Sequence, residues 1–313
     1  MVVALGGNAL APAGERPTIA NQFRHTRESL APVVELARLG WHIAIVHGNG
    51  PQVGDSLARN EIAETEVEPL PLGVLVAETA GWIGYMIQQS LQNALGETGV
   101  ARDVITVITQ SIVAADDPLL GRATKPIGHA LTARRRYSLE SRGVAIGKDA
   151  RGNPRRLTAS PQPVGIVERD VVRRLVDAGV IVIAAGGGGP PVFRDPVLGW
   201  EGVDAVVDKD RTAAILARDL GADLLLILTD VDAVYRDFGT SHAAPIRTLP
   251  LEEARALLAS GALGGGAGSM RPKVEAAVSF VEAGGKKAVI AKLQDGPAAV
   301  RGEAGTSIVA GSP

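Results

Sequence analysis

The chain opens with Val2-Val3-Ala4-Leu5-Gly6-Gly7-Asn8, a four-residue apolar run that ends directly in two glycines. Similar short apolar runs recur along the 313 residues, and longer stretches with helical spacing separate them. Strands that are apolar throughout are typical of a parallel sheet covered by helices on both faces. The sequence therefore predicts an α/β fold.

The same pattern gives the expected elements. We predict strands at residues 2–5, 42–47, 104–109, 180–184, 224–229, 287–290 and 306–309, and helices at residues 18–39, 72–95, 168–178, 211–220, 251–258 and 272–283. A glycine in the left-handed conformation ends a helix at little cost, and we expect this of Gly40, Gly96, Gly179 and Gly221. Residues 72–95 are apolar enough for an interface helix, although a core helix is the simpler explanation.

Two stretches interrupt the alternation. Residues 116–163 are rich in Arg, Gly and Pro and are longer than an ordinary connection, so they form either a lid-like subdomain or a disordered insert. We favour the lid-like subdomain. Residues 186–202 contain four consecutive glycines followed by two prolines, and we place a domain boundary just after them. The predicted domains are therefore residues 1–200 and residues 201–313.

Composition excludes several classes of protein. The 32 basic and 34 acidic residues nearly balance, and no basic run exceeds Arg134-Arg135-Arg136, so we expect no nucleic-acid partner. The absence of cysteine excludes disulfides, thiolate metal sites and cysteine nucleophiles, and the five histidines show no ligand spacing. We find no charged leader and no apolar stretch of roughly 20 residues, and we expect a cytoplasmic protein without membrane contact.

Three glycine-rich loops follow predicted strands: Gly6-Gly7-Asn8, Gly48-Asn49-Gly50, and the run Gly186, Gly187, Gly188 and Gly189. Parallel strands bind ligands at their carboxyl ends, where glycine lets backbone N–H groups surround an anion. A tight turn would explain one such loop, but three at one edge indicate phosphate binding. The known nucleotide motifs do not fit, because residues 48–54 carry an extra residue and a proline, and Gly285-Lys286-Lys287 lacks the Ser or Thr of a P-loop.

Lysine is scarce, since only seven of the 32 basic residues are lysines. An ammonium group is a compact charge that can follow a moving phosphoryl group, which makes lysines beside glycine loops candidates for transfer chemistry. Three qualify: Lys125 in the insert, Lys209 between Asp208 and Asp210, and Lys273 at a predicted helix start. We interpret the other four, including Lys292, as solvated surface residues.

The two aspartates beside Lys209 have different expected roles. One of them has an ordinary explanation as a helix cap. We select Asp210 as the carboxylate that keeps the lysines charged and oriented. Farther along, Thr229-Asp230 and Tyr235 follow an apolar strand, and this segment is explained equally well by a nucleotide site or by an ordinary turn.

Seven motifs, taken in order, resemble those of the carbamate kinases in the amino acid kinase family. They span nearly the whole chain and are residues 4–10, 46–54, 124–128, 186–192, 207–210, 228–232 and 268–276. Asn8 favours carbamate kinases, because acetylglutamate and aspartate kinases usually carry lysine at that position. The long insert also looks like the protruding subdomain of carbamate kinases. Arg271 stands where other members vary, and residues 240–244 follow no family pattern.

The resemblance implies a three-layer αβα sandwich around a mainly parallel open sheet, and a homodimer. It implies reversible, magnesium-dependent transfer between ATP and carbamate, giving ADP and carbamoyl phosphate, usually run toward ATP in arginine catabolism. Mg²⁺ would be carried by the nucleotide, with no metal-binding residue assigned in the chain. Lys125 would reach down from the subdomain, Lys209 and Lys273 would contact the phosphates, and Asp210 would hold the lysines.

The remaining implied contacts divide into two sets. The small substrate would be bound by Gly6, Gly7, Asn8, Gly48, Asn49, Gly50 and the four glycines 186–189, and the nucleotide by Thr229, Asp230, Tyr235 and Met270 together with Lys209 and Lys273. Two alternatives stay open. The chain could be another amino acid kinase acting on a different small carboxylate or phosphate, or a non-catalytic nucleotide- or anion-binding protein on the same fold. The three lysines argue against the second alternative.

Overall fold

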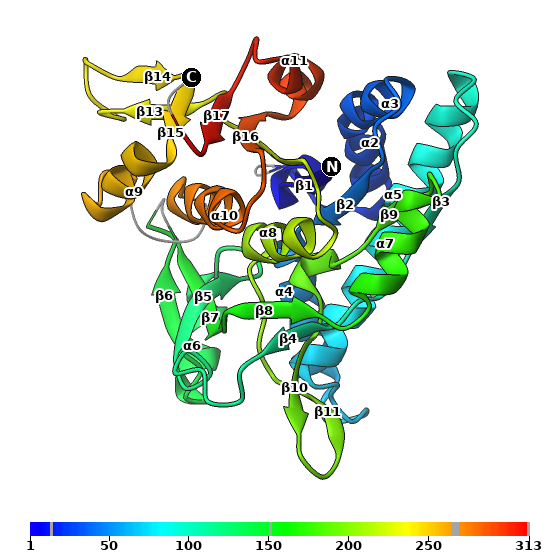
Figure 1. Cartoon of the computed structure of the whole chain (residues 1–313). Helices are drawn as coiled ribbons and strands as arrows, with labels where there is room; N and C mark the ends of the chain where they lie inside the picture. Colours follow the sequence, from blue (N-terminus) through cyan, green and yellow to red (C-terminus); the bar gives the residue numbers. More distant parts are fainter. Residues whose placement is uncertain (13–14, 150–151, 264–268, 312–313) are drawn as a thin grey trace.

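A single large sheet forms the centre of the chain in its computed structural model (Figure 1), which describes residues 1–12, 15–149, 152–263 and 269–311. The strand order is β15 (Thr248–Pro250), β17 (Thr306–Val309), β16 (Lys287–Lys292), β12 (Leu224–Thr229), β1 (Val2–Leu5), β2 (Ala44–His47), β9 (Ile181–Ile183) and β3 (Val104–Thr106). Every neighbouring pair is parallel except β16 with β17. The predicted α/β fold with a mainly parallel sheet is confirmed.

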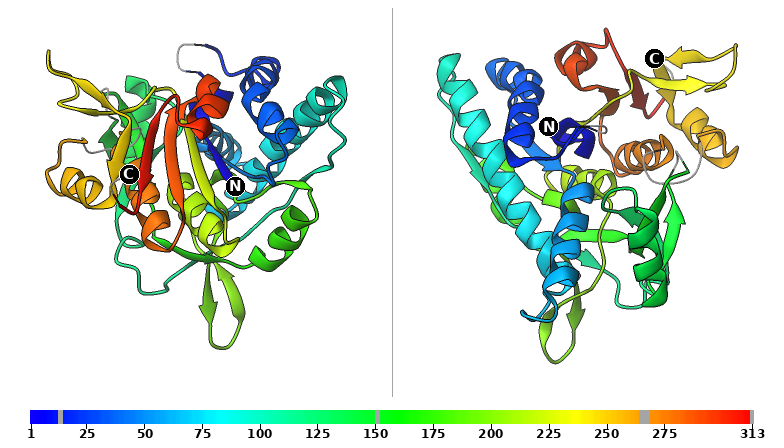
Figure 2. Two further views of the ribbon diagram at one scale, coloured as in Figure 1. Left: turned by 45° about the horizontal axis from the view of Figure 1, so that its top comes forward. Right: turned by 180° about the vertical axis from the view of Figure 1, so that it is seen from behind.

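Helices cover both faces of this sheet, as Figure 2 shows from two sides. The reason is visible in β1, where Val2 and Ala4 belong to one apolar cluster and Val3 and Leu5 to the other. The first cluster includes side chains of α7 (Arg169–Asp177), α8 (Lys209–Asp219), α9 (Leu251–Ala259) and α10 (Arg271–Glu282), and the second those of α3 (Ala31–Arg38), α5 (Leu72–Glu97) and α11 (Gly296–Arg301). The architecture is therefore the expected three-layer sandwich.

Two helix predictions differ from the structure. The helix expected at residues 18–39 is divided into α2 (Ile19–Ser29) and α3, with Leu30 between them. Pro32 lies in the first turn of α3, and because proline has no N–H to continue the bonding of α2, a new helix starts there. Helix α5 also runs past Gly96 to Glu97, and Gly99 takes the left-handed conformation instead, with φ 70°.

Helix α4 (Gly50–Ala63) is an element that the sequence interpretation missed. Its first residues are Gly50 and Pro51, which we had assigned to a loop. Proline is favoured in the first turn of a helix, because the N–H groups there have no partner within the helix. The second glycine loop is therefore short, and a helix begins within it.

The insert at residues 116–163 contains a small antiparallel sheet. Strands β5 (Ala123–Ile127), β7 (Pro154–Ala159) and β6 (Ile146–Lys148) pair in that order, and α6 (Ala133–Ser141) accompanies them. This subdomain lies beside α4, against which β5 packs (Figure 1). We call it the protruding subdomain.

The other elements complete the frame. A second sheet has the order β11 (Gly199–Gly202), β10 (Pro191–Asp195), β4 (Ser111–Val113) and β8 (Pro163–Ile166), and β13 (Val234–Arg236) pairs with β14 (Ala244–Ile246). Short turns of helix are α1 (Gly7–Leu10), η1 (Gly186–Gly188) and η2 (Leu293–Asp295). The boundary predicted after residue 200 falls within β11, and the division into two domains stays a prediction. Among the described residues, no helix has the length and apolarity needed to cross a membrane.

Candidate active site

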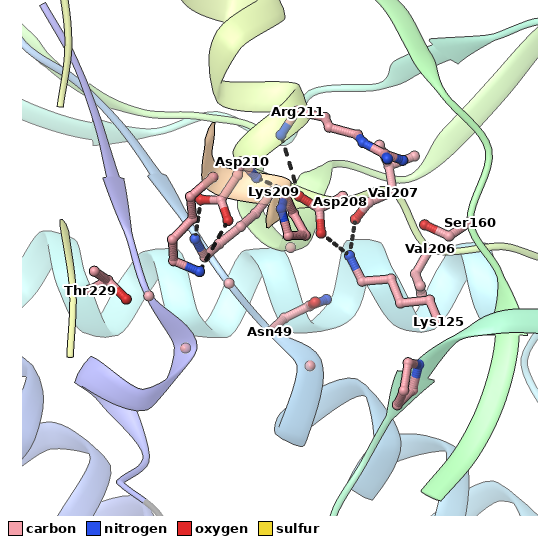
Figure 3. A pocket seen from close by; sticks show the side chains of 18 of the residues that line it. Asn49, Lys125, Ser160, Val206, Val207, Asp208, Lys209, Asp210, Arg211 and Thr229 are labelled. Atoms are coloured by element: carbon pink, nitrogen blue, oxygen red, sulfur yellow. Dashed lines mark hydrogen bonds and ion pairs between the residues drawn. The ribbon is translucent and has the colours of Figure 1, made fainter. Parts of the chain in front are cut away.

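A cavity of about 730 Å³ lies at the carboxyl ends of the central strands. Backbone following three of these strands lines it, namely Gly6-Gly7 after β1, Gly48-Asn49-Gly50 after β2, and Thr229-Asp230 after β12. Figure 3 shows Lys125 entering from the protruding subdomain, opposite the start of α8. Elements far apart in the sequence therefore meet at this edge of the sheet.

The start of α8 is fixed by Asp208. This residue has extended backbone, and its Oδ1 accepts hydrogen bonds from the backbone N–H groups of Asp210 at 2.9 Å and Arg211 at 3.3 Å. Side-chain oxygens at this position satisfy N–H groups that have no partner within the helix. The cap orients the first turn of α8, which carries Lys209 and Asp210 into the cavity.

The second carboxylate oxygen of Asp208 binds the subdomain lysine. Nζ of Lys125 lies 2.8 Å from Asp208 Oδ2 and 3.4 Å from the carbonyl oxygen of Val207. Burial raises the pKa of Asp208, but the charges of Lys125 and Lys209 and the backbone hydrogen bond from Arg211 outweigh it, so the pKa lies well below its usual value. Asp208 is therefore an anion that both caps the helix and holds Lys125.

Asp210 brings the other two lysines together. Its Oδ1 lies 2.5 Å from Nζ of Lys209, and its Oδ2 lies 3.6 Å from Nζ of Lys273 at the start of α10. The three side chains are 5 %, 14 % and 13 % exposed, respectively, so the pairing lies inside the cavity wall. One buried carboxylate thus lies next to two ammonium groups, and the role predicted for Asp210 in orienting them stays a prediction.

The floor of the cavity allows very little space for side chains. Gly187 has φ 67°, and a Cβ built on it would lie 2.2 Å from Nδ2 of Asn49. That amide in turn donates to Thr79 Oγ1 at 2.8 Å, and the hydroxyl bonds back to α5. Asn49 is therefore fixed by contacts on two sides, one of which only glycine permits.

Two arginines and one glutamate line the cavity where α8 and α10 approach each other. Glu275 accepts from Arg211 Nη2 at 3.1 Å and from Arg271 Nε at 2.8 Å. Arg271 Nη1 also donates to the carbonyl of Leu258 at 3.0 Å. Because two guanidinium groups share one carboxylate, this part of the wall is positively charged and suited to an anionic ligand.

Most of the predicted site residues lie in the wall of this one cavity. They are Gly6, Gly7, Gly48, Asn49, Gly50, Lys125, Gly187, Lys209, Asp210, Thr229, Asp230 and Lys273. Thr229 Oγ1 donates to Asp230 at 3.1 Å. Asn8 follows Gly7 in α1, and its side chain lies outside the described part of the structure. The three lysines and the glycine loops are therefore adjacent, whatever their individual roles.

The structure places five predicted residues outside the lining: Gly186, Gly188, Gly189, Tyr235 and Met270. The carbonyl oxygen of Gly188 accepts from Ser111 Oγ at 2.5 Å and from Thr212 Oγ1 at 3.1 Å, which fixes the loop from behind. Tyr235 donates to the carboxylate of Asp232 at 3.0 Å. Met270 immediately precedes α10 and packs against the core. Gly268, from the same motif, lies outside the described residues.

The sequence interpretation missed several lining residues, among them Ser160, Ser269, Arg271, Glu275 and Lys292. Lys292 is exposed, as expected of a solvated surface residue, but it also lines the cavity, because it is the last residue of β16 and pairs with Thr229 of β12. The predicted strand stopped at residue 290. Extending it by two residues would have placed Lys292 at the ligand-binding edge.

Glycine loops and clustered lysines at the carboxyl edge of a parallel sheet define a phosphate-binding α/β protein. The family model described as the amino acid kinase family matches residues 1–292, and the chain belongs to that family. Carbamate kinase of Halobacterium salinarum is 48 % identical over 98 % of this chain and 97 % of its own length. That of Clostridium perfringens is 43 % identical over 99 % of each.

Solved structures agree with the sequence relatives. Carbamate kinase from Giardia lamblia bound to citric acid has a TM-score of 0.93 and 33 % identity, over 99 % of this chain and 97 % of that one. The same enzyme bound to AMP-PNP gives a TM-score of 0.89 at 33 % identity, over 99 % and 98 %. The predicted similarity to carbamate kinases and the predicted phosphotransferase class are confirmed.

Proposed function

We propose that the chain catalyses reversible phosphoryl transfer between ATP and carbamate. In the direction proposed for the cell, ADP and carbamoyl phosphate give ATP and carbamate. An oxygen of the ADP β-phosphate forms a bond to phosphorus as the bond from phosphorus to the carbamate oxygen breaks. The observation that carries the proposal is the meeting of Lys125, Lys209 and Lys273 with two glycine loops in one cavity.

Such a cavity suits the chemistry, because phosphoryl transfer depends mainly on positioning and on neutralising charge that spreads over the phosphoryl oxygens. Lys209 and Lys273 would contact those oxygens, and Asp210 would keep both ammonium groups oriented. Lys125 would approach from the other side of the cavity. The N–H groups of the Gly6-Gly7 and Gly48-Asn49-Gly50 loops would bind the small substrate.

We propose that the nucleotide binds between Thr229-Asp230 and the starts of α8 and α10. Support comes from the Giardia relative, which was solved with the ATP analogue AMP-PNP. The N-terminal ends of these helices favour a negatively charged ligand, and the positive charges of Arg211 and Arg271 strengthen that preference. Mg²⁺ would enter as the nucleotide complex. Among the residues that the structure describes, no three His, Asp or Glu side chains gather as a metal site.

The experiment that tests the proposal measures ATP formed by the purified chain from ADP and carbamoyl phosphate, using a coupled hexokinase reaction. We expect ATP formation that requires both substrates and enzyme. The Lys209→Ala chain is the matched control, because it loses a central cation while we expect its circular dichroism spectrum to stay unchanged. Absence of ATP, or preferred phosphorylation of acetylglutamate or aspartate by ATP, would overturn the proposal.

We further propose a cytoplasmic homodimer acting in arginine catabolism. Support for the dimer comes from exposed apolar side chains near the free edge of the main sheet. These are Ile105 in β3, which is 40 % exposed, Ile108 after β3, which is 43 % exposed, and Tyr85 in α5, which is 55 % exposed. Ile83 and Met86 of the same helix are buried, so α5 is a core helix, and Val74 and Tyr85 are its exposed large apolar side chains. Light scattering after size-exclusion chromatography would test the dimer, and a monomeric mass at micromolar concentration would refute it.

A further inference from the structure

Helix α4 connects the glycine loop at the bottom of the site to the protruding subdomain that carries Lys125. It begins at Gly50, within the loop after β2, and extends to Ala63. Near its start, the Gly128 N–H donates to the Gly50 carbonyl oxygen at 3.0 Å. A Cβ on Gly54 would lie 2.0 Å from Gly128 Cα, so the two backbones are in direct contact. This first contact holds the end of β5 against α4.

A second contact lies near the other end of α4 and depends on one carboxylate. Glu61 is only 9 % exposed, and its two oxygens bind Arg135 of α6 and Arg156 of β7. Arg156 of β7 pairs with Ile127 of β5, and Ile127 is two residues from Lys125 in the same strand. Glu61 therefore fixes the strand pair that carries Lys125, from a position outside the catalytic cavity.

The charges make this contact sensitive to the loss of Glu61. Burial lowers the pKa of both guanidinium groups, and the charge of Arg156 lowers that of Arg135 further. Both side chains are less than one third exposed. Without the carboxylate, two like charges would face each other in a partly desolvated gap, and their repulsion would move the subdomain away from α4.

We infer that Glu61 is a positioning residue for phosphoryl transfer: it places Lys125 by tying the protruding subdomain to α4. The inference rests on the proposed function, and specifically on a catalytic role for Lys125. Glu61 itself touches no substrate. Thr124 and Ser160 of the subdomain also line the cavity, so the inference specifically requires that the effect of Glu61 on turnover passes through Lys125. This requirement distinguishes positioning of Lys125 from a general contribution to stability.

The test compares Glu61→Ala with Glu64→Ala in the assay of ATP formation. Glu64 is a matched control, because it lies on the same helix and binds the subdomain through Arg142 at 2.7 Å, but with 38 % of its side chain exposed. Exposed ion pairs contribute little. We expect kcat to fall at least about 10-fold in Glu61→Ala and to stay within about twofold in Glu64→Ala, with the KM for ADP little changed in both.

A double-mutant cycle with Lys125→Ala separates positioning of Lys125 from a merely structural role of Glu61. If Glu61 acts by placing Lys125, then Glu61→Ala should lower kcat by less than about twofold once Lys125 is already alanine. Equal losses in both backgrounds would overturn the inference. So would a Glu61→Ala enzyme with near-normal kcat beside a strongly impaired Lys125→Ala enzyme.

Two further outcomes are separable. Glu61→Gln keeps the side-chain volume and replaces Glu61→Ala in the cycle if the alanine variant does not fold, with circular dichroism as the check. A near-normal Lys125→Ala enzyme would overturn both the role of Lys125 and this inference, while ATP formation by the unmodified chain would still support the proposed reaction. Failure of the positioning role is thus distinguishable from failure of the function.

Discussion

His47 provides a quantitative test of how the floor of the site is held. It is the last residue of β2, it is fully buried, and its Nδ1 donates to the carbonyl oxygen of Gly48 at 3.1 Å. Nε2 makes no hydrogen bond of good geometry among the described residues, although the backbone of Ala80 lies close enough to the ring to oppose the fall in its pKa. A Cβ at Gly186 would lie 2.5 Å from that nitrogen, so the glycine loop covers it closely. Burial, only partly opposed by backbone hydrogen bonds, lowers the pKa to about 4.

The pH dependence follows from this pKa. Folding favours the neutral ring, so His47 contributes stability above its ordinary pKa of 6.5, and that contribution is lost as the pH falls from 6.5 toward 4. The gap between the two values corresponds to about 3 kcal/mol in full. About half of it, roughly 1.4 kcal/mol, should be lost by about pH 5.5.

Urea unfolding at about pH 7, 5.5 and 4.5 measures this loss in the unmodified chain and in His47→Gln. The glutamine chain will be less stable at pH 7, but its free energy of unfolding should fall less on acidification. At pH 5.5 its fall should be smaller than that of the unmodified chain by about 1.4 kcal/mol. His242→Gln, which changes an exposed ring, should follow the unmodified chain. If the curves for the unmodified chain and His47→Gln stay parallel, His47 does not titrate as a buried neutral ring and the reasoning is wrong.

The other predictions concern the site and its surroundings. Lys209→Ala should lower kcat by about 10²–10³ with an unchanged circular dichroism spectrum, and near-normal turnover would contradict its assigned role. Gly187→Ala should raise the KM for carbamoyl phosphate and lower the free energy of unfolding by about 1–3 kcal/mol, because the new Cβ would meet Asn49; an unchanged KM would count against that contact. The hydrogen bond and charge of Asp55 raise the pKa of His129, so an NMR titration should show a lower pKa in Asp55→Asn, and any stability advantage of the unmodified chain should disappear as the pH rises above the pKa of His129. An unshifted titration would show that the two side chains do not pair.

The large sheet was predictable because its strands are apolar on both faces. The strands at residues 2–5, 224–229 and 306–309 have the predicted bounds. Residues 2–5 and 224–228 are continuous apolar runs, which leave little alternative to a buried strand. Strand β17 begins with Thr306 and Ser307 and is only partly apolar, and the short edge strand β15 was not predicted. The strands of the protruding subdomain were missed because they are largely exposed or half-buried and polar, with no periodicity to mark them.

Prolines explain the main errors in the helices. Pro51 was interpreted as part of a loop, yet it lies in the first turn of α4, and Pro32 was accepted within one long helix, yet it begins a second one. Both cases follow one rule, since proline is tolerated where a helix starts and disruptive farther inside it. The sequence alone does not show whether a given proline lies at the start of a helix or inside one, until the neighbouring strands are placed.

The grouping of the lysines could be predicted, but the pairing of charges could not. Lys209 and Lys273 lie in the first turns of helices at the carboxyl edge of the main sheet, which brings them together in a parallel α/β fold. Lys125 lies within β5 of the protruding subdomain, so its approach to the site depends on where that subdomain packs. Asp208 and Asp210 are only two residues apart, but the first is a helix cap and the second lies within the first turn, so they point in different directions.

The two carboxylates therefore bind different lysines. Asp208 holds the lysine of the protruding subdomain, and Asp210 holds the two lysines attached to the main sheet. Three ammonium groups thus face two carboxylates, which leaves positive charge for the phosphates. Because the subdomain lysine has a carboxylate of its own, displacing the subdomain would remove Lys125 without disturbing Lys209 or Lys273. That separation is why perturbing the anchor of the subdomain should change turnover while nucleotide binding remains.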